Sequence, residues 1–118
     1  SDVISFHVHV TDETKSMVNK DWLGLMKPDI LLVNTSRGEI IDESELVQFL
    51  SENVNARIAT DVLADEICNR EKSPLLNYAK ESKQVIITPH IGGMTREAQE
   101  IAYNHAANLL IEVFKKEK

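Results

Sequence analysis

Four short apolar stretches, alternating with helical or polar segments, restrict the fold of this 118-residue chain more than any other feature. They cover Val3–Val8, Ile30–Asn34, Ala56–Val62 and Val85–Thr88. A short continuous apolar run is typical of a strand buried on both faces of a parallel sheet. Alternation of such strands with helices predicts an α/β fold, with a parallel sheet of about four strands and flanking helices.

Start and stop signals place the remaining elements. Residues 16–26 are predicted as a short helix that the polar stretch 11–14 caps. Asp42 is the expected N-cap of a helix to Asn53, with Glu45 three residues on as in a capping box. A loop over 63–72 precedes Ser73, which caps a turn led by a proline. The last helix, 95–116, has an apolar face so wide that we expect contacts on more than one side.

Composition excludes several classes of protein. The net charge of −6 argues against a nucleic-acid partner. The single cysteine excludes an intramolecular disulfide and fits a reducing compartment. No apolar run is long enough to span a membrane, and no signal peptide is visible, so a cytoplasmic location without a membrane partner is the default expectation. No metal site is predicted.

Polar groups follow three of the predicted strands. Thr35-Ser36-Arg37 follows the second, residues 61–66 close the third, and Pro89 ends the fourth just before His90. The carboxyl ends of parallel strands share one edge of the sheet, where ligands bind in open α/β folds. The glycines Gly92 and Gly93 allow close approach of the backbone before the last helix.

Each of these residues also has an ordinary structural interpretation. A lone arginine in a loop is most often a surface charge, and a lone histidine is more often structural than catalytic. Asp61 could form a turn, and Asp65 with Glu66 could be a solvated acidic pair. We favour function because chance seldom places an arginine, a carboxylate and a histidine at successive strand ends.

The chemistry available to such a trio is specific. A histidine bonded to a carboxylate is held in one tautomer and can carry a proton near neutral pH. An arginine offers a planar fork for a substrate carboxylate. Together they suit reversible oxidation of a hydroxyl group beside a carboxylate, with the hydride passing to a cofactor.

The chain resembles the D-isomer-specific 2-hydroxyacid dehydrogenases. The matching motifs are VNTSRGEIIDESEL (33–46), ATDV followed by Glu66, and TPHIGGMTREA (88–98), with a weaker match at DVISFHV. The resemblance implies a partial Rossmann-like fold, namely the second half of a dinucleotide-binding domain over residues 1–118, with NAD or NADP as cofactor. It also implies a small 2-hydroxy or 2-keto acid as substrate.

The resemblance assigns roles by motif. Arg37 corresponds to the substrate-orienting arginine, Glu66 to the carboxylate that partners the histidine, and His90 to the acid/base, whereas Asp65 falls out of register. Asp61 resembles the residue that contacts the nicotinamide carboxamide. The remaining positions that correspond to the cofactor site are Val8, Thr35, Ser36, Ile91, Gly92 and Gly93, together with Arg37 and His90.

Departures from the family pattern lead to two hypotheses. The four glycines form no Gly-x-Gly-x-x-Gly fingerprint, and no separate substrate domain is present. His9 and Ile67 stand where the family commonly has proline. We therefore expect a fragment of an NAD(P)-dependent oxidoreductase that is inactive alone, or alternatively a stand-alone non-catalytic half-domain that acts as an oligomerisation or interaction module.

The first strand and the last helix predict association. In the order 3-2-1-4-5-6 the strand that opens the second half pairs with the first strand of the domain, which this chain lacks. The segment Val3–Val8 should then be an exposed edge, and such edges recruit other chains. The prediction is a homo-oligomer that buries this strand, the last helix, or both.

Overall fold

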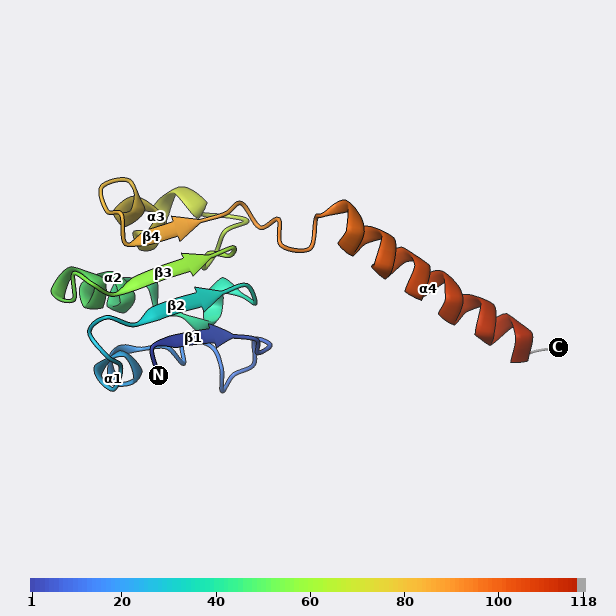
Figure 1. Cartoon of the computed structure of the whole chain (residues 1–118), viewed down its shortest axis with the longest axis horizontal. Helices are drawn as coiled ribbons and strands as arrows, with labels where there is room; N and C mark the ends of the chain where they lie inside the picture. Colours follow the sequence, from blue (N-terminus) through green and yellow to red (C-terminus); the bar gives the residue numbers. More distant parts are fainter. Residues whose placement is uncertain (117–118) are drawn as a thin grey trace.

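The computed structural model describes residues 1–116 and contains one four-stranded parallel sheet in the order β1-β2-β3-β4 (Figure 1). The strands are β1 (Val3–Phe6), β2 (Leu31–Asn34), β3 (Arg57–Thr60) and β4 (Val85–Ile87). The helices are α1 (Lys20–Gly24), α2 (Glu43–Glu52), α3 (Pro74–Ala79) and α4 (Arg96–Lys116), with short 3₁₀ turns η1 (Gly38–Ile40) and η2 (Arg70–Lys72). The predicted α/β class and parallel sheet are confirmed.

Local capping signals set two of the helix starts. Asp42 Oδ1 accepts hydrogen bonds from the amides of Ser44 and Glu45, both at 3.1 Å. Ser73 Oγ accepts from the amide of Leu76 at 3.0 Å. Both N-caps were predicted. The capping box is wrong, because the Glu45 carboxylate accepts from the amide of Lys20 instead of turning back to Asp42.

The helix predicted over residues 16–26 is shorter than expected and begins later. Its N-cap is Asn19, whose Oδ1 accepts from the amides of Asp21 and Trp22 at 3.1 Å. The stretch 11–14 instead closes a separate turn on itself. Val18, between the two, forms an isolated bridge with Ile41 and so cannot be helical.

One face of the sheet carries the core. Because each strand is added on the same side of the previous one, right-handed crossovers place α1, α2 and α3 on a single face. The side chains that point to these helices are buried, and the core cluster includes Phe6, Val18, Leu23, Ile30, Leu32, Leu46, Leu50, Ile58, Leu75 and Val85.

The other face of the sheet is open. Val33, Ala59 and Ile86 align across it, and Ile86 is 64% exposed. The expectation that these strands are buried on both faces is therefore wrong. Three consecutive crossovers of one hand leave no helix from residues 1–95 to cover the second face.

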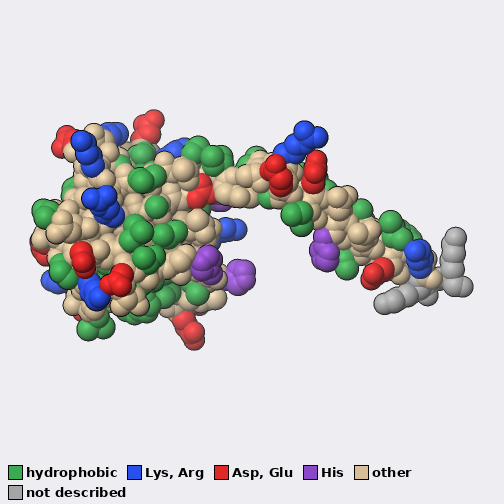
Figure 2. All heavy atoms as spheres, in the orientation of Figure 1, with side chains coloured by type: hydrophobic (Ala, Val, Ile, Leu, Met, Phe, Trp, Pro, Cys, Tyr) green, Lys and Arg blue, Asp and Glu red, His purple; other side chains and the backbone are tan. Residues whose placement is uncertain are grey.

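Helix α4 extends away from the sheet, which gives the molecule a longest dimension of 63 Å against 27 Å in the other two (Figure 1). Residues 100–115 are all exposed, including Ile101 at 71% and Phe114 at 65%. Figure 2 shows apolar side chains along this helix as well as over the sheet. The contacts expected on more than one side of the helix are absent from the described residues. None of the helices in 1–116 combines the length and apolarity that a membrane crossing requires.

Candidate active site

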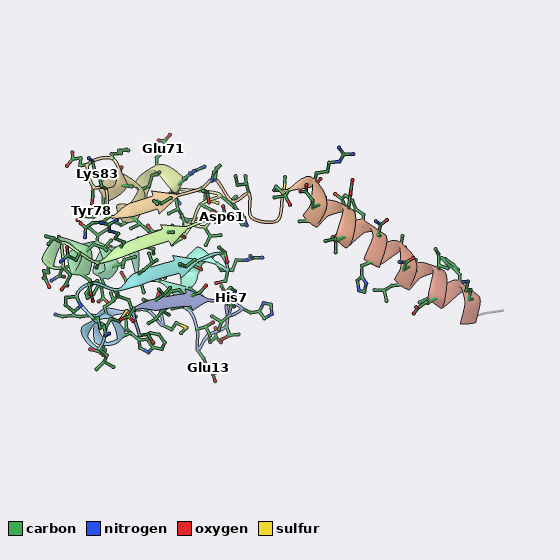
Figure 3. The ribbon with its side chains drawn as sticks, viewed as in Figure 1. His7, Glu13, Asp61, Glu71, Tyr78 and Lys83 are labelled. Carbon is green, nitrogen blue, oxygen red and sulfur yellow. The ribbon has the colours of Figure 1, made fainter. Side chains whose placement is uncertain are left out.

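The polar residues singled out above lie at the carboxyl edge of the sheet. Figure 3 shows Asp61 at the end of β3 and His7 beyond the end of β1, on the same edge. Parallel pairing of all four strands is what brings these ends together. The structure therefore gathers residues that are more than eighty positions apart in the sequence at one side of the molecule.

His90 and Glu66 form the pair expected from the sequence. The Nδ1 atom of His90 lies against Oε1 of Glu66 within hydrogen-bond distance. The imidazole is about half exposed and the carboxylate about a quarter exposed. A histidine with its Nδ1 atom on a carboxylate presents Nε2 to any reacting group in front of it.

The second oxygen of Glu66 fixes the carboxylate to its own loop. Oε2 accepts from the amide of Leu63 at 3.1 Å. Asp65, the neighbouring acidic residue, has a left-handed backbone with φ of 51° and accepts from Asn69 instead. The turn at Asp65 thus separates the two carboxylates, and only Glu66 reaches the histidine.

Asp61 holds the turn that carries His90. Its Oδ1 accepts from the Thr88 hydroxyl and from the amide of Ile91 at 3.0 Å, and its Oδ2 accepts from the amide of Gly92 at 2.7 Å. His90 adopts φ of 56°, a left-handed conformation that few residues with a side chain adopt. The Asp61 carboxylate, directly after β3, therefore stabilises a strained histidine in the turn that follows β4.

These bonds lower the pKa of Asp61. Burial acts to raise its pKa, but the hydrogen bonds from Thr88, Gly92 and Ile91, with the nearby His90, outweigh burial, so the pKa lies below its usual range. The group is consequently held as a carboxylate. Gly92 packs against it, since a Cβ there would lie 3.0 Å from Oδ2.

Asn34 organises the turn after β2. Its side chain is completely buried. Its Oδ1 accepts from the amide of Ser36 at 3.1 Å and from the hydroxyl of Ser36 at 3.0 Å, and its Nδ2 donates to the Arg37 carbonyl at 2.9 Å. Arg37 Nη1 donates to the Ser36 carbonyl at 2.7 Å, and the side chain is exposed. Thus Arg37 lies on the expected edge, but no hydrogen bond within residues 1–116 joins it to Glu66 or His90.

Two hollows mark this edge. One of about 250 Å³ is lined by His7, Val8, His9, Ser36 and Arg37. A smaller one of about 90 Å³ is lined by Val33, Thr35, Ala59, Thr60, Asp61, Ile86 and Thr88. Every predicted cofactor position up to Asp61 therefore borders one of the hollows. Ile91 is half exposed, and a Cβ on Gly93 would meet no atom within 4 Å, so the expected close backbone approach holds for Gly92 alone.

Sequence reasoning assigned no role to Asn34 and Thr88, which build the site, or to Glu43, which lies outside it. Glu43 is only 6% exposed and shares the buried face of α2 with Leu46 and Leu50. An acidic residue in an apolar stripe at helical spacing is a signal visible in the sequence. Thr88 offers no such signal, because its partner Asp61 lies on another strand.

Known proteins were compared with the chain. The family model for the NAD binding domain of D-isomer specific 2-hydroxyacid dehydrogenases matches residues 1–92. A glyoxylate reductase of Thermococcus litoralis is 41% identical over 100 residues, which are 85% of this chain and 28% of that one. A D-3-phosphoglycerate dehydrogenase of Escherichia coli is 39% identical over 112 residues, 95% of this chain and 27% of the relative.

Solved structures agree. A D-lactate dehydrogenase from Aquifex aeolicus, complexed with NAD and lactic acid, superposes with a TM-score of 0.79 at 31% identity, over 98% of this chain and 38% of that one. A D-lactate dehydrogenase from Sporolactobacillus gives 0.83 at 32% identity, over all of this chain and 38% of its own. The chain thus spans less than two fifths of the relatives named here. The match over residues 1–92 and the shared fold show that this chain belongs to the NAD-binding-domain family of the D-isomer-specific 2-hydroxyacid dehydrogenases.

Proposed function

We propose that the chain is the second half of the nucleotide-binding domain of an NAD(P)-dependent oxidoreductase that interconverts a D-2-hydroxy acid and its 2-keto acid. The observation that carries the proposal is the contact between Glu66 Oε1 and His90 Nδ1 at the carboxyl edge of the sheet. In this role His90 takes the hydroxyl proton on Nε2 when the substrate is oxidised and returns it on reduction. Glu66 orients the ring and stabilises its protonated form.

In the same role, Arg37 binds the carboxylate of the substrate. Its guanidinium is exposed next to the larger hollow, and within residues 1–116 it is bonded only through Nη1, so its other donors remain for a substrate carboxylate. This geometry favours a substrate with a carboxylate beside the reacting carbon. Glyoxylate, hydroxypyruvate and pyruvate all have that form.

The residues present fit NAD. A carboxylate has about four acceptor positions, and Asp61 uses three of them, so one is available for a carboxamide N–H. Val33 and Ala59 provide an apolar floor beside it. Val8, Thr35, Ser36, Ile91, Gly92 and Gly93 would complete this part of the site. When bound, the nicotinamide accepts or donates the hydride.

The test is a chimaera, because the 118 residues contain no glycine fingerprint and we expect no turnover from them alone. The chain would replace the matching segment of the Thermococcus litoralis glyoxylate reductase, and NADH oxidation would be followed with glyoxylate, hydroxypyruvate and pyruvate. We expect activity that falls by about two to four orders of magnitude in His90→Ala. A folded, NADH-binding chimaera whose activity survives His90→Ala would contradict the proposal.

The second candidate function is association without catalysis. The open sheet face around Ile86 and the apolar side chains of α4 favour it, because large exposed apolar surfaces mark contacts. Ile4 is only partly buried and Val3 is 54% exposed on β1, which forms one edge of the sheet. This surface supports a homo-oligomer in which a second copy covers the sheet face, α4 or both.

Sedimentation of the chain at micromolar concentration tests this candidate. We expect a species larger than the 13.3 kDa monomer. Ile86→Glu or Phe114→Glu should shift it toward monomer, whereas Val54→Glu, at an even more exposed apolar residue outside this surface, should not. A folded wild-type chain that sediments as a monomer would overturn the candidate.

A further inference from the structure

A buried carboxylate lies outside the site, on the first turn of α2. Glu43 is 6% exposed and occupies the same helix face as Leu46 and Leu50. A carboxylate in such a place is unfavourable unless hydrogen-bond donors surround it. The donors that do so belong to two other segments of the chain, which makes the residue a link between them.

Both carboxylate oxygens of Glu43 accept hydrogen bonds. Oε1 accepts from the amide of Ala64 at 2.8 Å. Oε2 accepts from the hydroxyl of Ser73 at 2.5 Å and from the amide of Leu75 at 3.4 Å. The side chain therefore ties α2 to the loop after β3 and to the start of α3.

The loop that Glu43 holds is the loop that orients Glu66. Ala64 follows Leu63, whose amide donates to Glu66 Oε2 at 3.1 Å. Gly38 packs on the same peptide, since a Cβ there would lie 2.0 Å from the Leu63 carbonyl carbon. The Leu63–Ala64 peptide is thus held between a glycine and a buried carboxylate. This fixes Leu63, whose own amide, one peptide earlier, donates to Glu66, and the other oxygen of Glu66 contacts His90.

We infer that Glu43 is a positioning residue, which keeps the Glu66 carboxylate on Nδ1 of His90 by fixing the Leu63–Ala64 peptide. The inference rests on the proposed function, in which His90 transfers the proton. With the peptide fixed, Glu66 keeps the imidazole proton on Nδ1 and leaves Nε2 as the acceptor. Without Glu43 the Ala64 amide loses its partner, the loop relaxes, and the carboxylate no longer holds one tautomer.

Nitrogen NMR of the 118-residue chain, labelled at its histidine imidazoles, measures the tautomer directly. Spectra would be recorded at about pH 9, well above the ordinary titration range of imidazole. His90 would be assigned by the loss of its signals in His90→Gln. We expect a protonated Nδ1 and an unprotonated Nε2 in the unmodified chain, and a shift of both signals toward a tautomer mixture in Glu43→Ala.

Companion variants separate positioning from stability. Glu43→Met fills the same space without accepting a hydrogen bond and should shift the signals even if Glu43→Ala fails to fold. Glu43→Gln keeps an acceptor for Ala64 and should restore the unmodified spectrum. The matched control is Gln84→Ala: Gln84 Nε2 donates to the carbonyls of Leu50, Asn53 and Ala56 at the amino end of the sheet, far from the pair, and its loss should leave His90 unchanged.

The outcomes distinguish failure of the positioning role of Glu43 from failure of the proposed function. If Glu66→Met, which removes the acceptor, shifts the His90 signals but Glu43→Met does not, Glu43 has no positioning role and the proposed function is untouched. If Glu66→Met itself leaves the signals unchanged, the pair does not operate in solution, and both the proposed function and this inference are overturned. A shift in Gln84→Ala as large as that in Glu43→Met would also overturn the inference, because general destabilisation would then explain it.

Discussion

Gly38→Ala should damage the chain far more than its small size suggests. Gly38 is buried in η1, and a Cβ there would lie 2.0 Å from the carbonyl carbon and 2.2 Å from the carbonyl oxygen of Leu63, and 2.3 Å from the amide nitrogen of Ala64. All three atoms are backbone, so no side chain can rotate away. To reach the ordinary contact distance of 3.4 Å, the two segments must separate by at least 1.4 Å.

The magnitude follows from what this separation breaks. Overpacking of a tight contact costs about 1–3 kcal/mol. The Ala64 amide would also leave Glu43, and a hydrogen bond to a charged group contributes about 1.5–3 kcal/mol. We therefore expect a loss of about 3–5 kcal/mol, a large part of the roughly 5–15 kcal/mol that stabilises an ordinary domain.

Urea unfolding followed by the fluorescence of Trp22, the single tryptophan, measures the effect. With a slope of about 2 kcal/mol per molar urea, the midpoint should fall by about 2 M. Gly24→Ala is the control, because Gly24 ends α1 and a Cβ there meets no atom within 4 Å. We expect that variant to be as stable as the unmodified chain or slightly more so. Equal midpoints for the two alanine variants would refute the packing argument.

Three further predictions concern other parts of the fold. The pKa of Asp61 is lower in the folded than in the unfolded chain, so its ionised form stabilises the fold at pH values above the usual pKa of 3.8, and this stabilisation is lost as the pH falls through the folded pKa. The difference in urea midpoint between the unmodified chain and Asp61→Asn should therefore be largest near neutral pH and shrink below about pH 3.8. A difference that stays constant with pH would contradict this prediction. Leu32→Ala, at a completely buried position in β2, should lower the unfolding free energy by about 2–5 kcal/mol in the same titration, and a loss below about 1 kcal/mol would mean that the core collapses around the gap. Asp42→Ala removes the cap of α2 and should cost about 0.5–2 kcal/mol, whereas Asp42→Ser should retain most of it.

The elements that could be predicted from the sequence depend on short-range physics. Apolar runs marked all four strands, although each is one to three residues shorter in the structure than predicted. Asp42 and Ser73 were recognisable as caps, because a cap bonds amides two or three residues away. That the third and fourth strands end at one edge, where Glu66 meets His90, was predictable from parallel pairing, whereas the choice of Glu66 over Asp65 came from the family resemblance.

Long-range contacts decided the rest. The open face of the sheet follows from three crossovers of one hand, a property of the strand order that apolar runs do not reveal. The wide apolar face of α4 predicted contacts that are absent from residues 1–116, because an apolar helix face does not indicate which segment or which other chain packs against it. The carboxylates of Asp61 and Glu43 accept hydrogen bonds from residues about 20 to 30 positions away, which the sequence does not show to be close. In this protein the sequence alone determined which residues stand at the ends of the strands. The tertiary structure alone decided which backbone amides hold Asp61 and Glu43 in place, because each of those bonds joins segments that only the packed sheet brings together.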